Sequence, residues 1–241
     1  MINNKVLVGT FLVALASIFT ISLYWNDFAG TLKVNVSMDR QLALESSKEA
    51  EKSFEILPKE LDQAVIYQFD SSLRNYVELK QGGRERFQNI IDNDVYSPYN
   101  WMVRSFKEGE IAELYVQFKP DGSPNGYILK VPEDYKSNNL DEEEALNLVT
   151  SNINKHWSGK FEDYELIESS FMEMPNGRID HTFVFEHKLK DIGDAKYRLS
   201  ANVAGSIVSK VNPYAFVPES FKREFANIRS DNNTIAAFAN Y

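Results

Sequence analysis

Three side chains that follow a predicted turn could do chemistry together. Arg178, Asp180 and His181 come directly after the turn signal Pro175-Asn176-Gly177, and His187 lies further along the same stretch. A guanidinium, a carboxylate and an imidazole at this spacing could form a polar binding site, or a weak metal site if the second histidine contributed. On an extended strand the two histidines are about 20 Å apart, which is too far for ligands of one ion. We therefore predict a polar cluster of Arg178, Asp180 and His181, with a structural ion pair of Arg178 as the alternative interpretation.

No other residues form a recognisable catalytic or cofactor site. The sequence has no Gly-x-Ser-x-Gly motif, and Gly82-Gly83 lacks the context of a phosphate-binding loop. The absence of cysteine excludes disulfides, thiol catalysis and cysteine-ligated zinc. We accordingly expect no catalytic residue, no metal and no cofactor in this chain.

The acidic composition restricts the partners. The chain has 241 residues, 43% of them apolar, and a formal net charge of -9. Phosphate binding needs a basic face, so this charge argues against a nucleic-acid partner.

The N-terminal residues predict a membrane anchor. Residues 6–25 contain no charged side chain and end on Tyr24 and Trp25, which are typical of a membrane interface. Twenty helical residues span about 30 Å, the thickness of a hydrocarbon core. A cleaved signal peptide is the alternative, but Trp25-Asn26-Asp27-Phe28 does not resemble a cleavage site. Lys5 places residues 1–5 in the cytoplasm and most of the chain outside it.

Two segments of the chain begin with the same helical pattern. "MDRQLALESSKEAEKSF" starts at Met38, and "LDEEEALNLVTSNINKHW" starts at Leu140. Asp39 and Asp141 are suitable N-cap residues, and Asp141 with Glu144 forms a variant of the capping box. In the second segment, apolar residues recur at helical spacing and form one stripe: Ala145, Val149, Ile153 and Trp157.

Alternating patterns typical of antiparallel strands follow each predicted helix. One pair of strands surrounds the turn at 120–122, another surrounds Gly205, and a further hairpin surrounds 175–177. We predict two units, 34–135 and 139–221, each consisting of a helix packed on a small antiparallel sheet. Between 55 and 100 the pattern is less regular, although a helix broken near Gly82-Gly83 fits.

Aromatic residues gather in the first unit. Most such residues in strands belong to a core or a sheet face, but these could also form a groove for an extended peptide. They are Trp101, Phe106, Tyr115, Phe118 and Tyr127.

The order of these features resembles a known family. The units resemble PepSY/cystatin-like units, and the whole chain resembles the N-terminal region of CPBP-family membrane proteins, relatives of type II CAAX prenyl endopeptidases. The stretches that carry the resemblance are "MDRQLAL", "WMVRSF", "PDGSPNGY", "VPED", "LDEEEAL", "PNGRIDHTFVFEH" and "VPESFKREFANIRSDNNTIA". The catalytic Glu-Glu-x-x-x-Arg motif of that family is missing, because Glu142-Glu143-Glu144 has no arginine in register and fits a helix N-terminus.

The resemblance implies an α+β protein with an N-terminal transmembrane helix and two helix-on-sheet units. Its expected place is the bacterial inner membrane, with a single pass at 6–25 as its contact with the lipid bilayer. Residues 222–241 are expected to approach a second transmembrane helix, so that the chain is cut from a longer intramembrane endopeptidase with a polytopic protease domain.

The expected function is a non-catalytic sensory or regulatory domain that binds a ligand or substrate peptide. The alternative is a stand-alone, membrane-tethered PepSY-like module that binds or inhibits a protease. A third hypothesis, an enzyme of unknown type on the soluble side, has no recognisable set of catalytic residues to support it.

Overall fold

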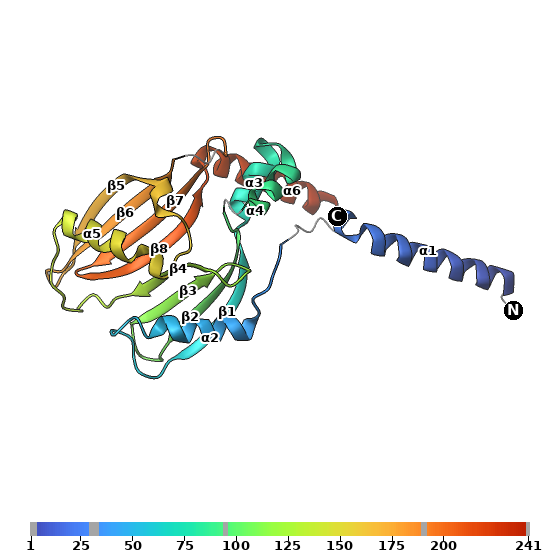
Figure 1. The fold of residues 1–241 in the computed structure, drawn as a ribbon. Helices are drawn as coiled ribbons and strands as arrows, with labels where there is room; N and C mark the ends of the chain where they lie inside the picture. Colours follow the sequence, from blue (N-terminus) through green and yellow to red (C-terminus); the bar gives the residue numbers. More distant parts are fainter. Residues whose placement is uncertain (1–3, 29–33, 94–95, 189–191, 240–241) are drawn as a thin grey trace. The chain divides into compact units, whose positions relative to one another are not determined.

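The structure, a computed structural model, describes residues 4–28, 34–93, 96–188 and 192–239 (Figure 1). The chain divides into two compact units, Met1–Asn35 and Val36–Tyr241. The first contains helix α1 (Asn4–Phe28), in which Ser17 and Thr20 donate hydrogen bonds to backbone oxygens one turn earlier.

The prediction of a transmembrane anchor at residues 6–25 is wrong. Within the described part of the chain, no helix combines the length and the apolar character that crossing a bilayer requires. The predicted bilayer contact and single-pass placement in an inner membrane are therefore not supported. Of residues 222–241, predicted to approach a second span, 222–239 belong to helix α6 (Glu219–Ala239), and 240–241 lie outside the described residues.

The second unit is built on one antiparallel sheet. In the described residues the strand order is β1-β2-β3-β4-β8-β7-β6-β5. The strands are β1 (Asp62–Phe69), β2 (Tyr99–Phe106), β3 (Glu113–Phe118), β4 (Pro124–Lys130), β5 (Tyr164–Glu173), β6 (Ile179–His187), β7 (Lys196–Ala204) and β8 (Ile207–Phe216). The predicted hairpins at 120–122, 175–177 and 205 are confirmed as β3–β4, β5–β6 and β7–β8.

The prediction of two separate small sheets is wrong, because the two halves share one sheet. They meet at a seam between β4 and β8, where Tyr127 pairs with Val211 and Ile128 pairs with Lys210. Gly126 precedes the seam with a φ of +110°, and a Cβ atom there would collide with the carbonyl oxygen of Val211. A residue without a side chain therefore lets the two edges approach each other.

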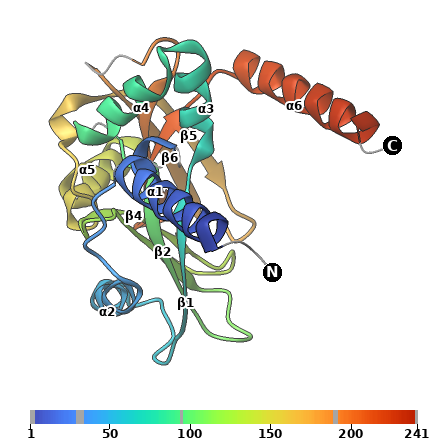
Figure 2. The same ribbon diagram turned by 90° about the vertical axis from the view of Figure 1, so that its right-hand side faces the viewer.

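Helices α2 (Arg40–Glu51) and α5 (Glu142–Asn152) lie on the same face of the sheet (Figure 2). The predicted caps are confirmed. The carboxylate of Asp39 accepts from Leu42 N at 2.8 Å, and Asp141 forms a complete capping box with Glu144. Each helix begins where the side chain of its N-cap residue accepts a hydrogen bond from a first-turn amide. The local sequence therefore determines where α2 and α5 begin.

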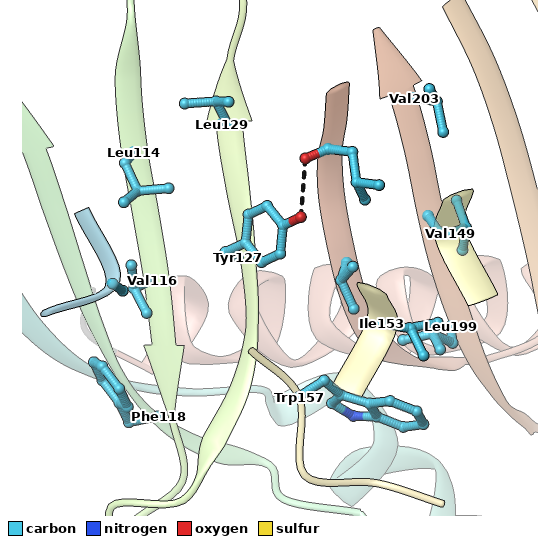
Figure 3. Close-up of a cluster of buried hydrophobic side chains, with 14 of the residues drawn as sticks. Leu114, Val116, Phe118, Tyr127, Leu129, Val149, Ile153, Trp157, Leu199 and Val203 are labelled. Carbon is cyan, nitrogen blue, oxygen red and sulfur yellow. Dashed lines mark hydrogen bonds between the residues drawn. The ribbon is translucent and has the colours of Figure 1, made fainter. Parts of the chain in front are cut away.

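The buried side chains of the two halves form one continuous core between the sheet and these helices. Figure 3 shows Tyr127 near its centre, with its hydroxyl donating to Val208 O at 2.9 Å. The predicted stripe of the second helix is buried in this core, although the α-helix ends at Asn152 and a 3₁₀ turn, Ile153–Lys155, follows. Of the aromatic set, Phe118 and Tyr127 belong to the core, whereas Trp101 is partly buried against it.

The connection between β1 and β2 contains two helices. These are α3 (Ser71–Lys80) and α4 (Gly83–Asp92), so the predicted helix broken near Gly82-Gly83 is confirmed. They pack against the second half of the sheet. The hydroxyl of Tyr76 accepts a hydrogen bond from Asp194 N at 2.9 Å, and its ring meets Phe221 of α6 edge-on at 5.2 Å.

Candidate functional site

The predicted polar cluster lies at the end of the sheet where β5 turns into β6. Arg178 is only 3% exposed and forms a two-pronged ion pair with Asp180, with Nε–Oδ1 at 2.8 Å and Nη2–Oδ2 at 3.0 Å. Its Nη1 donates to the carbonyl oxygens of Pro132 and Tyr135 at 2.7 and 3.0 Å. The alternative interpretation of a structural ion pair is confirmed, because these contacts tie the linker between the halves, residues 131–141, to the hairpin.

The histidines have separate roles. His181 is buried, and its Nε2 lies 2.9 Å from the carbonyl oxygen of Leu140, so it joins the same anchoring of the linker. His187 lies at the other end of β6, with Nε2 3.8 Å from Asp163 Oδ2. Among the described side chains, no group of three or more potential ligands is placed to hold a metal ion.

A cavity of about 320 Å³ lies at the opposite end of the sheet, where β4, β5 and β7 begin and β6 and β8 end. We call it the end cavity. Its wall is assembled from segments far apart in the sequence. The lining residues are Asn93, Tyr96, Ser97, Lys119, Asn125, Trp157, Ser158, Gly159, Lys160, Asp163, Tyr164, His187, Tyr197, Arg198, Pro213 and Tyr214.

The segment after α5 forms one wall because backbone hydrogen bonds hold it to β4. Gly126 N donates to His156 O at 2.8 Å, and Ser158 N donates to Pro124 O at 3.0 Å. Between these contacts Trp157 is buried, and a Cβ atom on Gly159 would collide with its indole ring. The chain therefore bends over the tryptophan only because residue 159 has no side chain.

Aromatic rings supply much of the cavity wall. Trp157 meets Tyr164 edge-on at 5.5 Å between ring centroids, and Tyr164 meets His187 in the same way at 4.9 Å. On another wall Tyr96 stacks on Tyr197 at 5.7 Å. Such pairs fix the ring orientations and leave flat apolar surfaces for a planar ligand.

Tyr197 carries a polar atom without a partner. The residue is 2% exposed, and its buried hydroxyl makes no hydrogen bond with any described residue. Burial raises the pKa of Tyr197, and burial followed by the charge of Asp163 raises the pKa of Tyr164 to about 12. Both phenols are therefore protonated donors at neutral pH, and a buried donor without an acceptor costs about 1–3 kcal/mol.

Positive groups outnumber negative ones around the cavity. The lining contains three cationic side chains, those of Lys119, Lys160 and Arg198, and one carboxylate, that of Asp163. Arg198 is held in place from outside the cavity, because Nε and Nη2 lie 3.0 Å from one oxygen of Glu186 and the guanidinium lies 4.0 Å above the ring of Phe216. A fixed guanidinium beside protonated phenols favours an anion.

A second cavity, of about 410 Å³, lies between α2 and α5, with Phe54, Tyr127 and His156 in its lining. Burial and then Lys155 lower the pKa of His156. The phenol of Tyr127 donates to Val208 O, and among the described residues that line this cavity no buried polar side-chain atom lacks a partner. We therefore take the end cavity as the candidate site.

The sequence did not predict the end cavity. The sequence pattern places Trp157 at the end of a helical stripe and assigns no role to the other rings. The signal in the sequence is the presence of tyrosine and tryptophan in connections and at strand ends, and these residues form a site only after the strands are ordered.

The comparisons with known proteins do not identify the chain. No family model matches it, and neither a curated protein nor a solved structure is similar enough to count as a match. No match therefore supports a PepSY or CPBP assignment, and the resemblance to the N-terminal region of those proteases stays a prediction. What the protein does must be argued from the end cavity.

Proposed function

We propose that the protein is a non-catalytic binding module that takes a small aromatic carboxylate in the end cavity. The observation that carries the proposal is the buried hydroxyl of Tyr197, which lacks an acceptor and belongs to a residue that lines the cavity together with aromatic rings and cations. A carboxylate oxygen is the acceptor that such a hydroxyl lacks.

The three features of the cavity select the ligand together. The flat faces of Trp157 and Tyr164 favour a planar apolar body. The surplus of positive charge favours an anion, and about 320 Å³ is at the small end of the range for ligand pockets. An aromatic ring with one carboxylate combines planarity, charge and size. The proposal does not depend on the resemblance to membrane proteases.

Calorimetric titration of the full chain with benzoate, benzamide and acetate tests the proposal. Benzamide keeps the ring without the charge, and acetate keeps the charge without the ring. We expect benzoate to bind at least tenfold more tightly than either, because a hydrogen bond to a charged group contributes about 1.5–3 kcal/mol. Equal affinity for benzoate and benzamide, or no benzoate binding by folded protein, would overturn the proposal.

A matched pair of variants locates the binding. Tyr197→Phe keeps the ring and removes the unpaired hydroxyl, so benzoate affinity should fall about tenfold. Tyr67→Phe makes the same change on β1, in a residue that does not line the cavity, and should leave the affinity unchanged. Equal effects of the two substitutions would place benzoate outside the cavity.

A further inference from the structure

The outer edge of β5 has the features of a docking site, and this surface lies beyond the proposed ligand cavity. β5 is the last strand of the sheet, and it is exposed from Glu165 to Glu173. Phe171 is 71% exposed and Met172 is 66% exposed, while Leu166 and Ile167 are also exposed. A long edge strand that presents large apolar side chains is a template for a further strand.

The backbone of this strand offers unpaired groups in a regular order. Met174 N donates to Arg178 O at 2.7 Å, and the register pairs Met172 with Asp180. Because hydrogen-bonded and non-hydrogen-bonded pairs alternate in an antiparallel ladder, the amides of Ser169, Phe171 and Glu173 point away from β6. An added strand could therefore bond to this edge without disturbing the sheet.

The charge of the edge identifies its occupant. Glu165, Glu168 and Glu173 are exposed, and none of them forms a hydrogen bond or ion pair with another described residue. A second copy pairing through β5 would bring two such acidic strands together, and the chain already has a net charge of -9. Like charges on paired strands are destabilising, so the glutamates oppose self-association and favour a basic partner.

We propose that β5 receives an extended segment of another protein in which basic and apolar residues alternate. The added strand pairs with the outward amides of β5. Its cations lie on the face of the sheet that carries Glu165 and Glu168, and its apolar side chains lie on the other face, which carries Leu166 and Phe171. The opposite edge of the sheet, β1, has only Asp62 as an acidic residue, so the same peptide has less to recognise there.

The first experiment is a peptide titration of the full chain, followed by fluorescence anisotropy. The probe is a labelled peptide of alternating lysine and valine, and the control alternates glutamate and valine. We expect the lysine peptide to bind at least tenfold more tightly, with the difference shrinking at high salt. Equal binding of the two peptides, or sedimentation showing that the protein dimerises through this edge, would overturn the proposal.

Two sets of substitutions test whether the peptide binds at β5. Glu165→Lys combined with Glu168→Lys, on the face that the cations occupy, should reverse the preference, so that the glutamate peptide binds better. Ser169→Pro removes one outward amide and should lower affinity about tenfold, whereas Ser169→Ala keeps the amide and should not. If the proline variant loses the native circular dichroism spectrum, the test rests on the charge-reversed variant. If that variant still prefers the lysine peptide to the glutamate peptide, docking at β5 is refuted.

Discussion

The two halves of the sheet share one plan and differ at one connection. Each half is a four-strand meander covered by a capped helix, in the described residues. In the second half a tight turn joins β5 to β6, whereas in the first half α3 and α4 lie between β1 and β2. The inserted helices reach the second half through Tyr76 and Asp194, and the chain after them stacks Tyr96 on Tyr197. The end cavity exists because the halves are not identical.

The largest expected effect breaks the seam between the halves. Gly126→Ala should lower the free energy of unfolding by about 4 kcal/mol or more, because the Cβ atom collides with the Val211 carbonyl and φ is positive. Gly109→Ala is the control, since its φ is +83° but no atom lies near the added Cβ. It should cost about 1 kcal/mol. Urea denaturation measures both, and equal costs would show that the seam tolerates a side chain.

The next prediction compares the ion pairs of the two halves. Arg178→Met should destabilise the protein by roughly 3 kcal/mol, because it leaves Asp180 unpaired and releases two linker carbonyls. Arg104 of the first half pairs with Glu113 but is 41% exposed, so Arg104→Met should cost clearly less. Thermal unfolding compares them. A larger loss for the Arg104 variant would mean that the linker does not depend on its anchor.

Two buried phenols differ in whether their hydroxyl group has an acceptor. Tyr127→Phe should cost about 1–2 kcal/mol, because it leaves Val208 O without its donor. Tyr197→Phe removes a hydroxyl that has no partner, so stability should rise by up to about 1 kcal/mol. Chemical denaturation in the absence of ligand measures the change in the free energy of unfolding, with its sign, for both variants. A destabilised Tyr197→Phe protein would indicate that the hydroxyl already has a partner, such as bound water.

The smallest effect concerns pH. Hydrogen bonds from Arg104, with further donors Tyr115 and Lys130, lower the pKa of Glu113 to about 2. A carboxylate whose folded pKa lies below its unfolded value stabilises the protein above the unfolded pKa, near 4.3, and this contribution disappears as the pH falls toward 2. Urea midpoints at pH 6 and pH 3 should therefore differ less for Glu113→Gln than for the wild type. An identical drop would exclude this carboxylate as a cause of acid sensitivity.

Local features of the fold could be predicted from the sequence. The caps at Asp39 and Asp141 and the turn at 175–177 depend on neighbouring residues, so short patterns were enough. The pattern does not predict β1, because Ala64, Val65, Ile66 and Tyr67 are apolar without alternation, in an edge strand whose residues are exposed or only partly buried.

The remaining features depend on contacts between distant residues. The seam pairs Tyr127 with Val211, and no local pattern states that these two edges meet. The end cavity likewise requires the strand order and the α3–α4 insertion, so no local pattern brings its rings together. The ion pair of Arg178, the alternative interpretation of the polar cluster, follows from the sequence, but the hold of Arg178 on the linker involves backbone carbonyls that carry no sequence signal.

The shortness of the seam has a mechanical consequence. In the described residues two pairs join β4 to β8, whereas β7 and β8 are paired along most of their lengths. Under a pulling force across the sheet, the strands should part first at the seam, because few backbone pairs join them there. Arg178 fastens the linker to the second half, so the linker still connects the two halves after the seam opens. The two halves of the sheet therefore separate before either one unfolds.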